Sequence, residues 1–327
     1  MNNKSIEFTS FTQSILSDIR ERLGKDYTVF SHTVKKNNGV ELTGIVSRKE
    51  GCNTSPSVYI NELYHENMTE TEVEEAAEQV YAALKKAEIT ENIDFSDFSD
   101  YEKVKTRIAV KLVNAERNKE LLAEIPHMPF LDLALVVYYP VQELPFEGKA
   151  AILIYHSHRE VWKVETDELL RTAIANTPKL FPGKIESMDS IMRQIFAVDS
   201  GESVAEGLQK LGICDEEELE ALIPPIQMVQ KNRIPMYVLS NEQKLYGAVS
   251  ILYPDILKKF TKKIDQDCYI LPSSIHEVIL VPASTVADEK ELREIVTDIN
   301  RTQVAEDEVL ADSVYYYNRS LDRIMLI

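Results

Sequence analysis

Residues 268–282, with the sequence CYILPSSIHEVILVP, constrain the fold most strongly, because a short polar interruption separates two apolar runs. The apolar residues of Tyr269–Leu271 and the β-branched residues of Val278–Val281 predict two buried strands. Pro272 and Ser273 suit a turn, since proline fixes φ and serine can bond to its own backbone. The stretch therefore predicts an antiparallel hairpin whose turn is polar.

Helical and strand patterns alternate along the rest of the chain. Apolar residues recur at three- and four-residue steps in segments that we expect to be amphipathic helices, namely 5–23, 70–86, 166–176 and 288–300. Strand patterns occur at 27–35, 40–48, 57–60, 107–113, 131–139, 150–155, 236–239, 245–252, 314–317 and 323–327. These elements predict an α+β fold in which mixed or antiparallel sheets are covered by helices.

Several local signals define where these elements begin and end. Thr69 and Glu72 predict a capping box, and Asn38-Gly39 predicts a tight hairpin because both residues tolerate positive φ. The helix that starts at Thr166 is expected to stop before Pro178, since the residue before a proline is biased away from helical angles. Residues 115–123 look helical, and residues 126–129, PHMP, are expected to interrupt the pattern. In the 288–300 helix, four side chains are expected to face inward: Leu292, Ile295, Val296 and Ile299.

The length of 327 residues fits two to three units. We divide the chain into an N-terminal α/β-hairpin unit, a middle α+β unit and a C-terminal α+β unit, at 1–95, 96–230 and 231–327. Residues 131–176 and 236–264 share the order strand, turn, strand, helix. This similarity has two interpretations, a common supersecondary arrangement or an internal repeat.

Composition restricts the compartment and the partners. A net charge of −18 disfavours binding to nucleic acid and to anionic membranes, and 44% hydrophobic residues suffice for a packed core. Cys52, Cys214 and Cys268 form no CxxC pair and no zinc spacing, which indicates reduced thiols. The N-terminus lacks a signal-peptide pattern, and no apolar run approaches the roughly 20 residues of a membrane span. We therefore expect a cytoplasmic protein.

Several segments together resemble one bacterial family. They are KNNGVELTGIVSRKE (36–50), SPSVYINELY (55–64), PFLDLALVVYYP (129–140), YILPSSIHEVILVP (269–282) and NRTQVAEDEVLADSVYYY (300–317). The family is the one catalogued as domain of unknown function 5688, and the resemblance covers nearly the whole chain. It implies a bacterial origin and carries no activity, cofactor or catalytic residue.

The polar interruption of the hairpin is the first candidate site. A catalytic interpretation would assign a serine nucleophile, a histidine base and an orienting carboxylate to Ser273, Ser274, His276 and Glu277. Side chains alternate along a strand, so Glu277 would point away from the face shared by Ser274 and His276. In the alternative interpretation the serines satisfy free backbone groups of a turn and His276 is hydrogen-bonded or solvated.

The second candidate site is the sequence His156-x-His158-x-Glu160. If this segment is extended, its three side chains lie on one face and could hold a metal ion, with His127 as a possible helper. The alternative is a polar connection between a strand and a helix, in which Trp162 packs on the core.

The sequence favours a binding or interaction protein without catalysis. It contains no GxxxxGK[ST], GxGxxG, HExxH or GxSxG motif, and only 10 glycines, so we expect no cofactor. The partner would be an unknown protein or small molecule, with no nucleic acid and no membrane. The alternative is a hydrolase-like enzyme whose site combines the segments Ser273–Glu277 and His156–Glu160.

Overall fold

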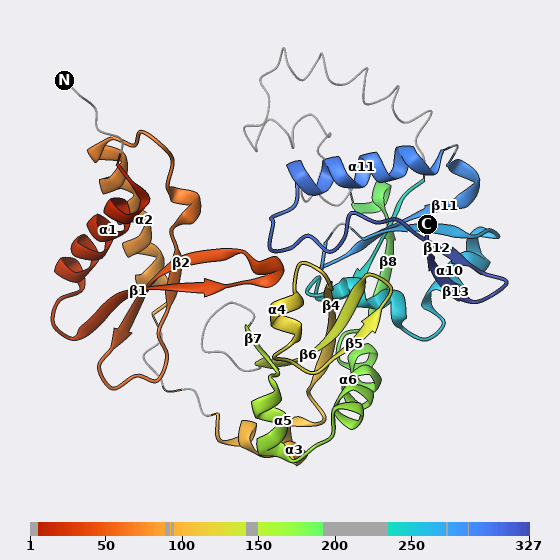
Figure 1. Cartoon of the computed structure of the whole chain (residues 1–327), viewed down its shortest axis with the longest axis horizontal. Coiled ribbons are helices and arrows are strands. Elements are labelled where there is room, and N and C mark those ends of the chain that lie inside the picture. The colour runs from red at the N-terminus through yellow and green to blue at the C-terminus, as the bar shows by residue number, and fades with distance from the viewer. Residues whose placement is uncertain are drawn as a thin grey trace, which may run out of the picture. The chain divides into compact units, whose positions relative to one another are not determined.

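The computed structural model describes residues 6–88, 92, 95–141, 150–191, 235–272, 274–286 and 288–327. These residues belong to two compact units (Figure 1). The first unit comprises 1–106 and 138–164, and the second comprises 107–137 and 165–327. The predicted boundary at 95/96 falls inside the first segment of the first unit, and the boundary at 230/231 lies outside the described residues.

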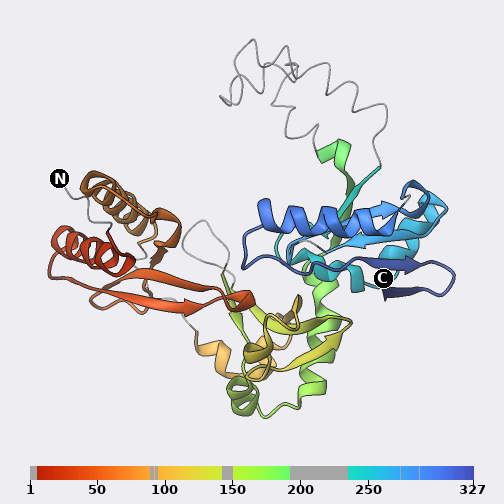
Figure 2. The same ribbon diagram turned by 45° about the horizontal axis from the view of Figure 1, so that its top comes forward.

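The N-terminal part of the first unit is a small sheet covered by two helices. Its elements are α1 (Phe8–Leu23), β1 (Tyr27–Lys35), η1 (Asn37–Gly39), β2 (Glu41–Lys49), β3 (Ser57–Tyr59), η2 (Asn61–Leu63) and α2 (Glu70–Lys86). The sheet is antiparallel in the order β1-β2-β3, and α1 and α2 lie side by side against it (Figures 1 and 2). The predicted Thr69–Glu72 capping box is present, and Asn38 has a φ of 60° in the hairpin turn.

The remainder of the first unit is organised around the only tryptophan of the chain. It contains η3 (Ser96–Ser99), α3 (Tyr101–Val104), β7 (Ala150–Leu153) and α5 (His156–Trp162). Trp162 is buried, and its Nε1–H donates to the carbonyl oxygen of Phe98 at 2.8 Å. The indole therefore packs on the core, as in the second of the two interpretations of this segment.

The second unit is built on a six-stranded antiparallel sheet. Its strand order is β13-β12-β10-β11-β9-β8, formed by β8 (Gly183–Ser187), β9 (Tyr237–Asn241), β10 (Cys268–Leu271), β11 (Val278–Pro282), β12 (Tyr315–Asn318) and β13 (Arg323–Leu326). The predicted hairpin is its centre, with Tyr269 opposite Val281. Helix α11 (Glu289–Thr302) lies along one face (Figures 1 and 2), where Leu292 and Val296 pack against Leu271.

The remaining elements complete the described chain. They are β4 (Ala109–Asn114), α4 (Lys119–Leu122), β5 (His127–Phe130), β6 (Leu133–Val141), α6 (Thr166–Leu180), η4 (Gly247–Leu252), α10 (Ile256–Ile264) and η5 (Ala283–Thr285). Strand β6 begins in the second unit and ends in the first. Strands β4, β6 and β5 are neighbours in that order, and β7 also pairs with β6. The three sheets, all antiparallel, and their helices confirm the predicted α+β class.

One predicted helix end was wrong, and one strand was not predicted, because tertiary contacts override the local signal. Helix α6 continues through Pro178 to Leu180. Thr177 ties this turn to β4, since its Oγ1 accepts from Val110 N–H at 2.9 Å and donates to the Ala173 carbonyl at 2.6 Å. Residues 127–130 form strand β5, where Pro129 is tolerated because β5 is an edge strand.

Three further predictions were wrong in how segments are buried or folded. Residues 247–252 form the 3-10 helix η4 and not a strand, because a fully buried apolar run has no alternation to distinguish the two. This also removes the second strand on which the repeat hypothesis depended. The predicted helix at 115–123 is confined to Lys119–Leu122. Ile295 and Ile299 of α11 are 42% and 39% exposed, since its buried stripe follows every fourth residue.

Within the described ranges, no helix is both long and apolar enough to cross a membrane.

Candidate functional site

The turn between β10 and β11 is held by backbone bonds to a distant segment of the second unit. Ser274 pairs with Val309 in an isolated antiparallel bridge, and Ile275 N–H donates to the Glu308 carbonyl at 2.9 Å. The Oγ of Ser274 accepts from the backbone N–H of His276 at 3.1 Å. Ser273 lies outside the described residues. Backbone hydrogen bonds to residues 308 and 309 therefore hold the turn in place.

Both ring nitrogens of His276 have partners. Nδ1 accepts a hydrogen bond from the Tyr246 backbone N–H at 3.2 Å, and Nε2 lies 3.4 Å from Oε1 of Glu308. An Nδ1 that accepts must be unprotonated, so the hydrogen-bond pattern assigns the ring proton to Nε2. His276 thus accepts from the backbone of one loop, and its Nε2 faces the carboxylate of another segment.

The His276 ring also stacks on an aromatic neighbour. The Tyr246 ring is nearly parallel to it, at a centroid distance of 5.6 Å and an interplanar angle of 13°. Lys111 of β4 places its Nζ 4.2 Å from the centroid of the same tyrosine ring, within cation–π range. Burial, reinforced by Glu308 and Asp307, raises the pKa of the Tyr246 phenol. Tyr246 therefore remains a neutral stacking partner.

Close backbone packing explains why this arrangement forms. Ser240 Oγ–H donates to the His276 carbonyl at 2.8 Å. A Cβ on Gly247 would lie 2.2 Å from Ser240 Oγ and 2.6 Å from the His276 carbonyl, so only glycine fits. Tyr246 precedes this glycine in a left-handed conformation, with a φ of 54°. We call Lys111, Tyr246, His276 and Glu308 the His276 cluster.

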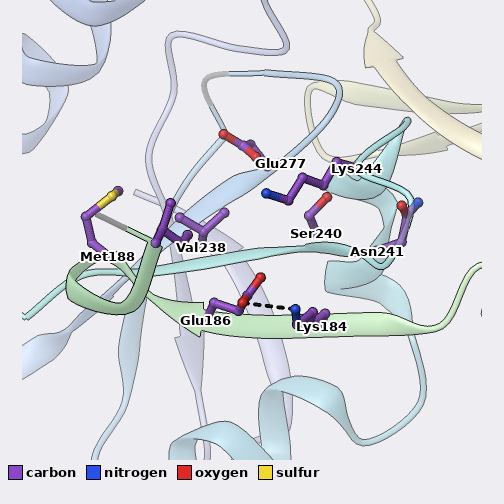
Figure 3. Close-up of a pocket in the computed structure, with 9 residues that line it drawn as sticks. Lys184, Glu186, Met188, Val238, Ser240, Asn241, Lys244 and Glu277 are labelled. Carbon is purple, nitrogen blue, oxygen red and sulfur yellow. Dashed lines mark ion pairs between the residues drawn. The ribbon is translucent and has the colours of Figure 1, made fainter. Parts of the chain in front are cut away.

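Glu277 points to a different place, a cavity of about 170 Å³ on the second unit (Figure 3). The cavity is lined by residues of β8, β9 and their flanking segments: Lys184, Glu186, Met188, Ile191, Val238, Ser240, Asn241, Lys244 and Glu277. Lys184 and Glu186 form an ion pair at 2.9 Å. Asn241, buried at the cavity, shapes the following turn by accepting from Leu245 N–H and donating to its carbonyl.

His156, His158 and Glu160 lie in the first unit on α5, so the extended geometry required by the metal hypothesis is absent. On a helix, positions 156 and 160 share a face and position 158 points elsewhere. His158 Nδ1 accepts from the Tyr155 backbone N–H at 3.2 Å, and burial lowers the pKa of its ring. Phe98 packs edge-on to it at 5.2 Å. His158 therefore caps the start of its own helix.

The remaining metal candidate, His127, lies on β5 with Nδ1 3.1 Å from the Ile125 carbonyl oxygen. In the part of the chain that the structure describes, no group of three His, Cys, Asp or Glu side chains could hold a metal ion.

The sequence pointed to His276 and Glu277 but not to the residues that surround them. Tyr246, Glu308 and Lys111 come from three segments far from the hairpin in sequence, and no local pattern links them. Lys244 of the cavity was also missed. The one available signal was Tyr246-Gly247, since a glycine that follows a polar turn often marks a close backbone approach.

The fold and the site define an α+β protein in which both ring nitrogens of His276 have partners and a small cavity is lined by charged residues. The chain belongs to the family described as "Family of unknown function (DUF5688)", whose model matches residues 8–319. This confirms the resemblance seen in the sequence. Neither the curated proteins nor the solved structures contain a significant match to this chain.

Proposed function

We propose that this protein is a non-catalytic binding protein of the bacterial cytoplasm. The observation that supports it best is the use of His276 as a structural connector. Nδ1 takes the Tyr246 backbone N–H and Nε2 faces Glu308, so neither nitrogen is free to remove a proton from a serine.

The serine side chain supports the same conclusion. A nucleophilic serine needs its hydroxyl within hydrogen-bond reach of the base. Ser274 Oγ instead accepts from the backbone N–H of His276, which is the behaviour of a turn residue. In the other candidate segment, His158 Nδ1 is used by the Tyr155 N–H. Ser274 and His158 therefore each accept from a backbone N–H close to them in sequence.

Charge and thiol chemistry support the compartment and the partner class. A net charge of −18 favours a small molecule or a protein over nucleic acid or an anionic membrane. Cys268 is a free thiol, as expected in a reducing compartment. Burial raises the pKa of Cys268 to about 12, so this thiol is a packing group and not a nucleophile.

A hydrolysis assay tests the proposal. The purified full-length protein is incubated with p-nitrophenyl carboxylic and phosphate esters, beside the variants Ser273→Ala, Ser274→Ala and His276→Ala. We expect the wild type and all three variants to release p-nitrophenol at the same background rate.

The alternative hydrolase makes the opposite prediction. Turnover by the wild type that is lost in a serine variant and in His276→Ala, with far-UV circular dichroism unchanged, would overturn the non-catalytic proposal. Ser273→Ala is included because the position of Ser273 lies outside the described residues.

A further inference from the structure

The polar side chains of the cavity on the second unit come from strand β8, strand β9 with the segment that follows it, and the residue before β11, and the His276 ring is not among its lining groups. Strand register places Lys184 opposite Ser240 and Glu186 opposite Val238. Because Leu239 pairs with Val278, Glu277 comes opposite Ser240 on the other side of β9. Side chains that are directly opposite on neighbouring strands share one face of a sheet. The polar groups therefore project from three adjacent strand segments into one space.

The charges in this cavity are not equivalent. Glu186 has a side chain only 15% exposed and is neutralised by Lys184. Among the described residues, neither the Lys244 ammonium nor the Glu277 carboxylate has a hydrogen-bond or ion-pair partner. Figure 3 shows Lys244 extending over Ser240 on the side where Glu277 lies. The cavity thus offers one cation and one anion that the protein itself leaves available.

The rest of the lining is apolar and small. Met188, Ile191 and Val238 form the apolar part, and Val238 is buried. The volume of about 170 Å³ lies below the roughly 300–1,000 Å³ of pockets for drug-sized ligands. A fitting ligand therefore has few atoms, one positive and one negative group, and a short hydrocarbon part.

We propose that this cavity binds a free α-amino acid with an aliphatic side chain. The carboxylate of the ligand pairs with Lys244 and its ammonium with Glu277, while the side chain contacts Met188 and Val238. Each charge then gains an opposite charge in a partly enclosed site, where ion pairs are stronger than in bulk water. The inference rests on the proposed binding function and assigns its ligand class.

Isothermal titration calorimetry on the full-length protein tests this with L-leucine as the probe. Two analogues separate the charges: 3-methylbutylamine lacks the carboxylate and 4-methylpentanoate lacks the ammonium. We expect L-leucine to bind and each analogue to bind at least about tenfold more weakly, since each loses one ion pair.

Charge-removing variants with matched controls locate the site. Lys244→Met and Glu277→Gln should each weaken L-leucine binding by about tenfold or more. Lys263→Met and Glu242→Gln remove the same charges from exposed positions outside the cavity and should bind as the wild type does.

Two results would overturn the inference. One is the absence of heat and of any thermal shift with millimolar L-leucine, while the wild type remains folded. The other is L-leucine binding that is unchanged in both Lys244→Met and Glu277→Gln. Neither result would show that the protein is a hydrolase. The ester assay alone tests the non-catalytic proposal, and the calorimetry alone tests the ligand class.

Discussion

The backbone N–H of Tyr246 donates to Nδ1 of His276 at 3.2 Å, and the two rings stack at a centroid distance of 5.6 Å. A backbone donor from one loop thus meets a side-chain acceptor from another. This hydrogen bond joins the turn of the central hairpin to the start of η4, so His276 has a structural role.

Replacing His276 by alanine should destabilise the second unit. The Tyr246 N–H would lose its acceptor in a partly buried place, at a cost of about 1–3 kcal/mol in the free energy of unfolding. Urea unfolding followed by circular dichroism measures this loss. His65→Ala, at an exposed histidine, should change the same free energy by no more than about 0.5 kcal/mol. Equal midpoints for His276→Ala and the wild type would contradict the structural role.

Asp132 should stabilise the second unit through Tyr315, which is fully buried. Its carboxylate accepts from the Tyr315 hydroxyl and the Ser313 hydroxyl, each at 2.6 Å. Asp132→Ala leaves the phenol without its acceptor and should cost about 1–3 kcal/mol in urea unfolding.

The loss should be smaller when Asp132→Ala is made in a Tyr315→Phe background, because no phenol then remains unsatisfied. A coupling energy of about 0.5–3 kcal/mol is expected from this double-mutant cycle. Asp298→Ala removes a carboxylate whose partner is the exposed Arg301 and serves as the matched control. Strict additivity would show that the hydrogen bond contributes nothing.

Glu88 should make the stability of the first unit depend on acidic pH. Lys85, Tyr27 and Lys49, in that order of strength, lower the pKa of Glu88 to about 2. In the unfolded chain a glutamate has a pKa of about 4.3. A carboxyl whose folded pKa is depressed stabilises above its unfolded pKa, and this contribution is lost as pH falls toward 2.

The wild type should therefore lose stability between about pH 5 and pH 2 more steeply than Glu88→Gln. The fluorescence of Trp162, the only tryptophan, reports unfolding of this unit. Glu74→Gln, on the exposed face of α2, should keep the wild-type slope. Identical slopes for Glu88→Gln and the wild type would argue against the ion-pair network.

Thr69 should stabilise α2 through its capping box. Its Oγ1 accepts from the Glu72 N–H, and the Glu72 carboxylate accepts from the Thr69 N–H at 2.7 Å. Thr69→Ala should lower the free energy of unfolding by about 0.5–2 kcal/mol. Thr71→Ala replaces an exposed threonine of the same helix and should have little effect. Chemical denaturation followed by Trp162 fluorescence compares the two, and similar losses would contradict the cap.

Local sequence signals predicted the elements that depend on few neighbours. The capping box at Thr69, the positive φ of Asn38 and the antiparallel hairpin of 269–271 with 278–281 were all confirmed. Each follows from backbone geometry within a short segment, which is why a single stretch of residues is enough to predict it.

Local sequence signals did not predict how the candidate site is arranged. His276 was recognised as a polar residue at a turn, but the sequence left a catalytic and a structural interpretation open. The choice depends on the partners of its two nitrogens, Tyr246 and Glu308, which are about 30 residues away on either side. Similarly, the His156–Glu160 hypothesis required an extended segment, and packing of Trp162 and Phe98 accompanies a helix there.

By itself, the sequence determined the α+β class, the central hairpin and the family, because these follow from periodicity, turn chemistry and residue order. The tertiary structure alone decided which groups meet: Thr177 with β4, His276 with Tyr246, and Lys184, Lys244 and Glu277 around one cavity. The physical reason is that the packing of whole elements determines the long-range contacts. Whether a polar group then finds a partner depends on this packing and not on its neighbours in sequence.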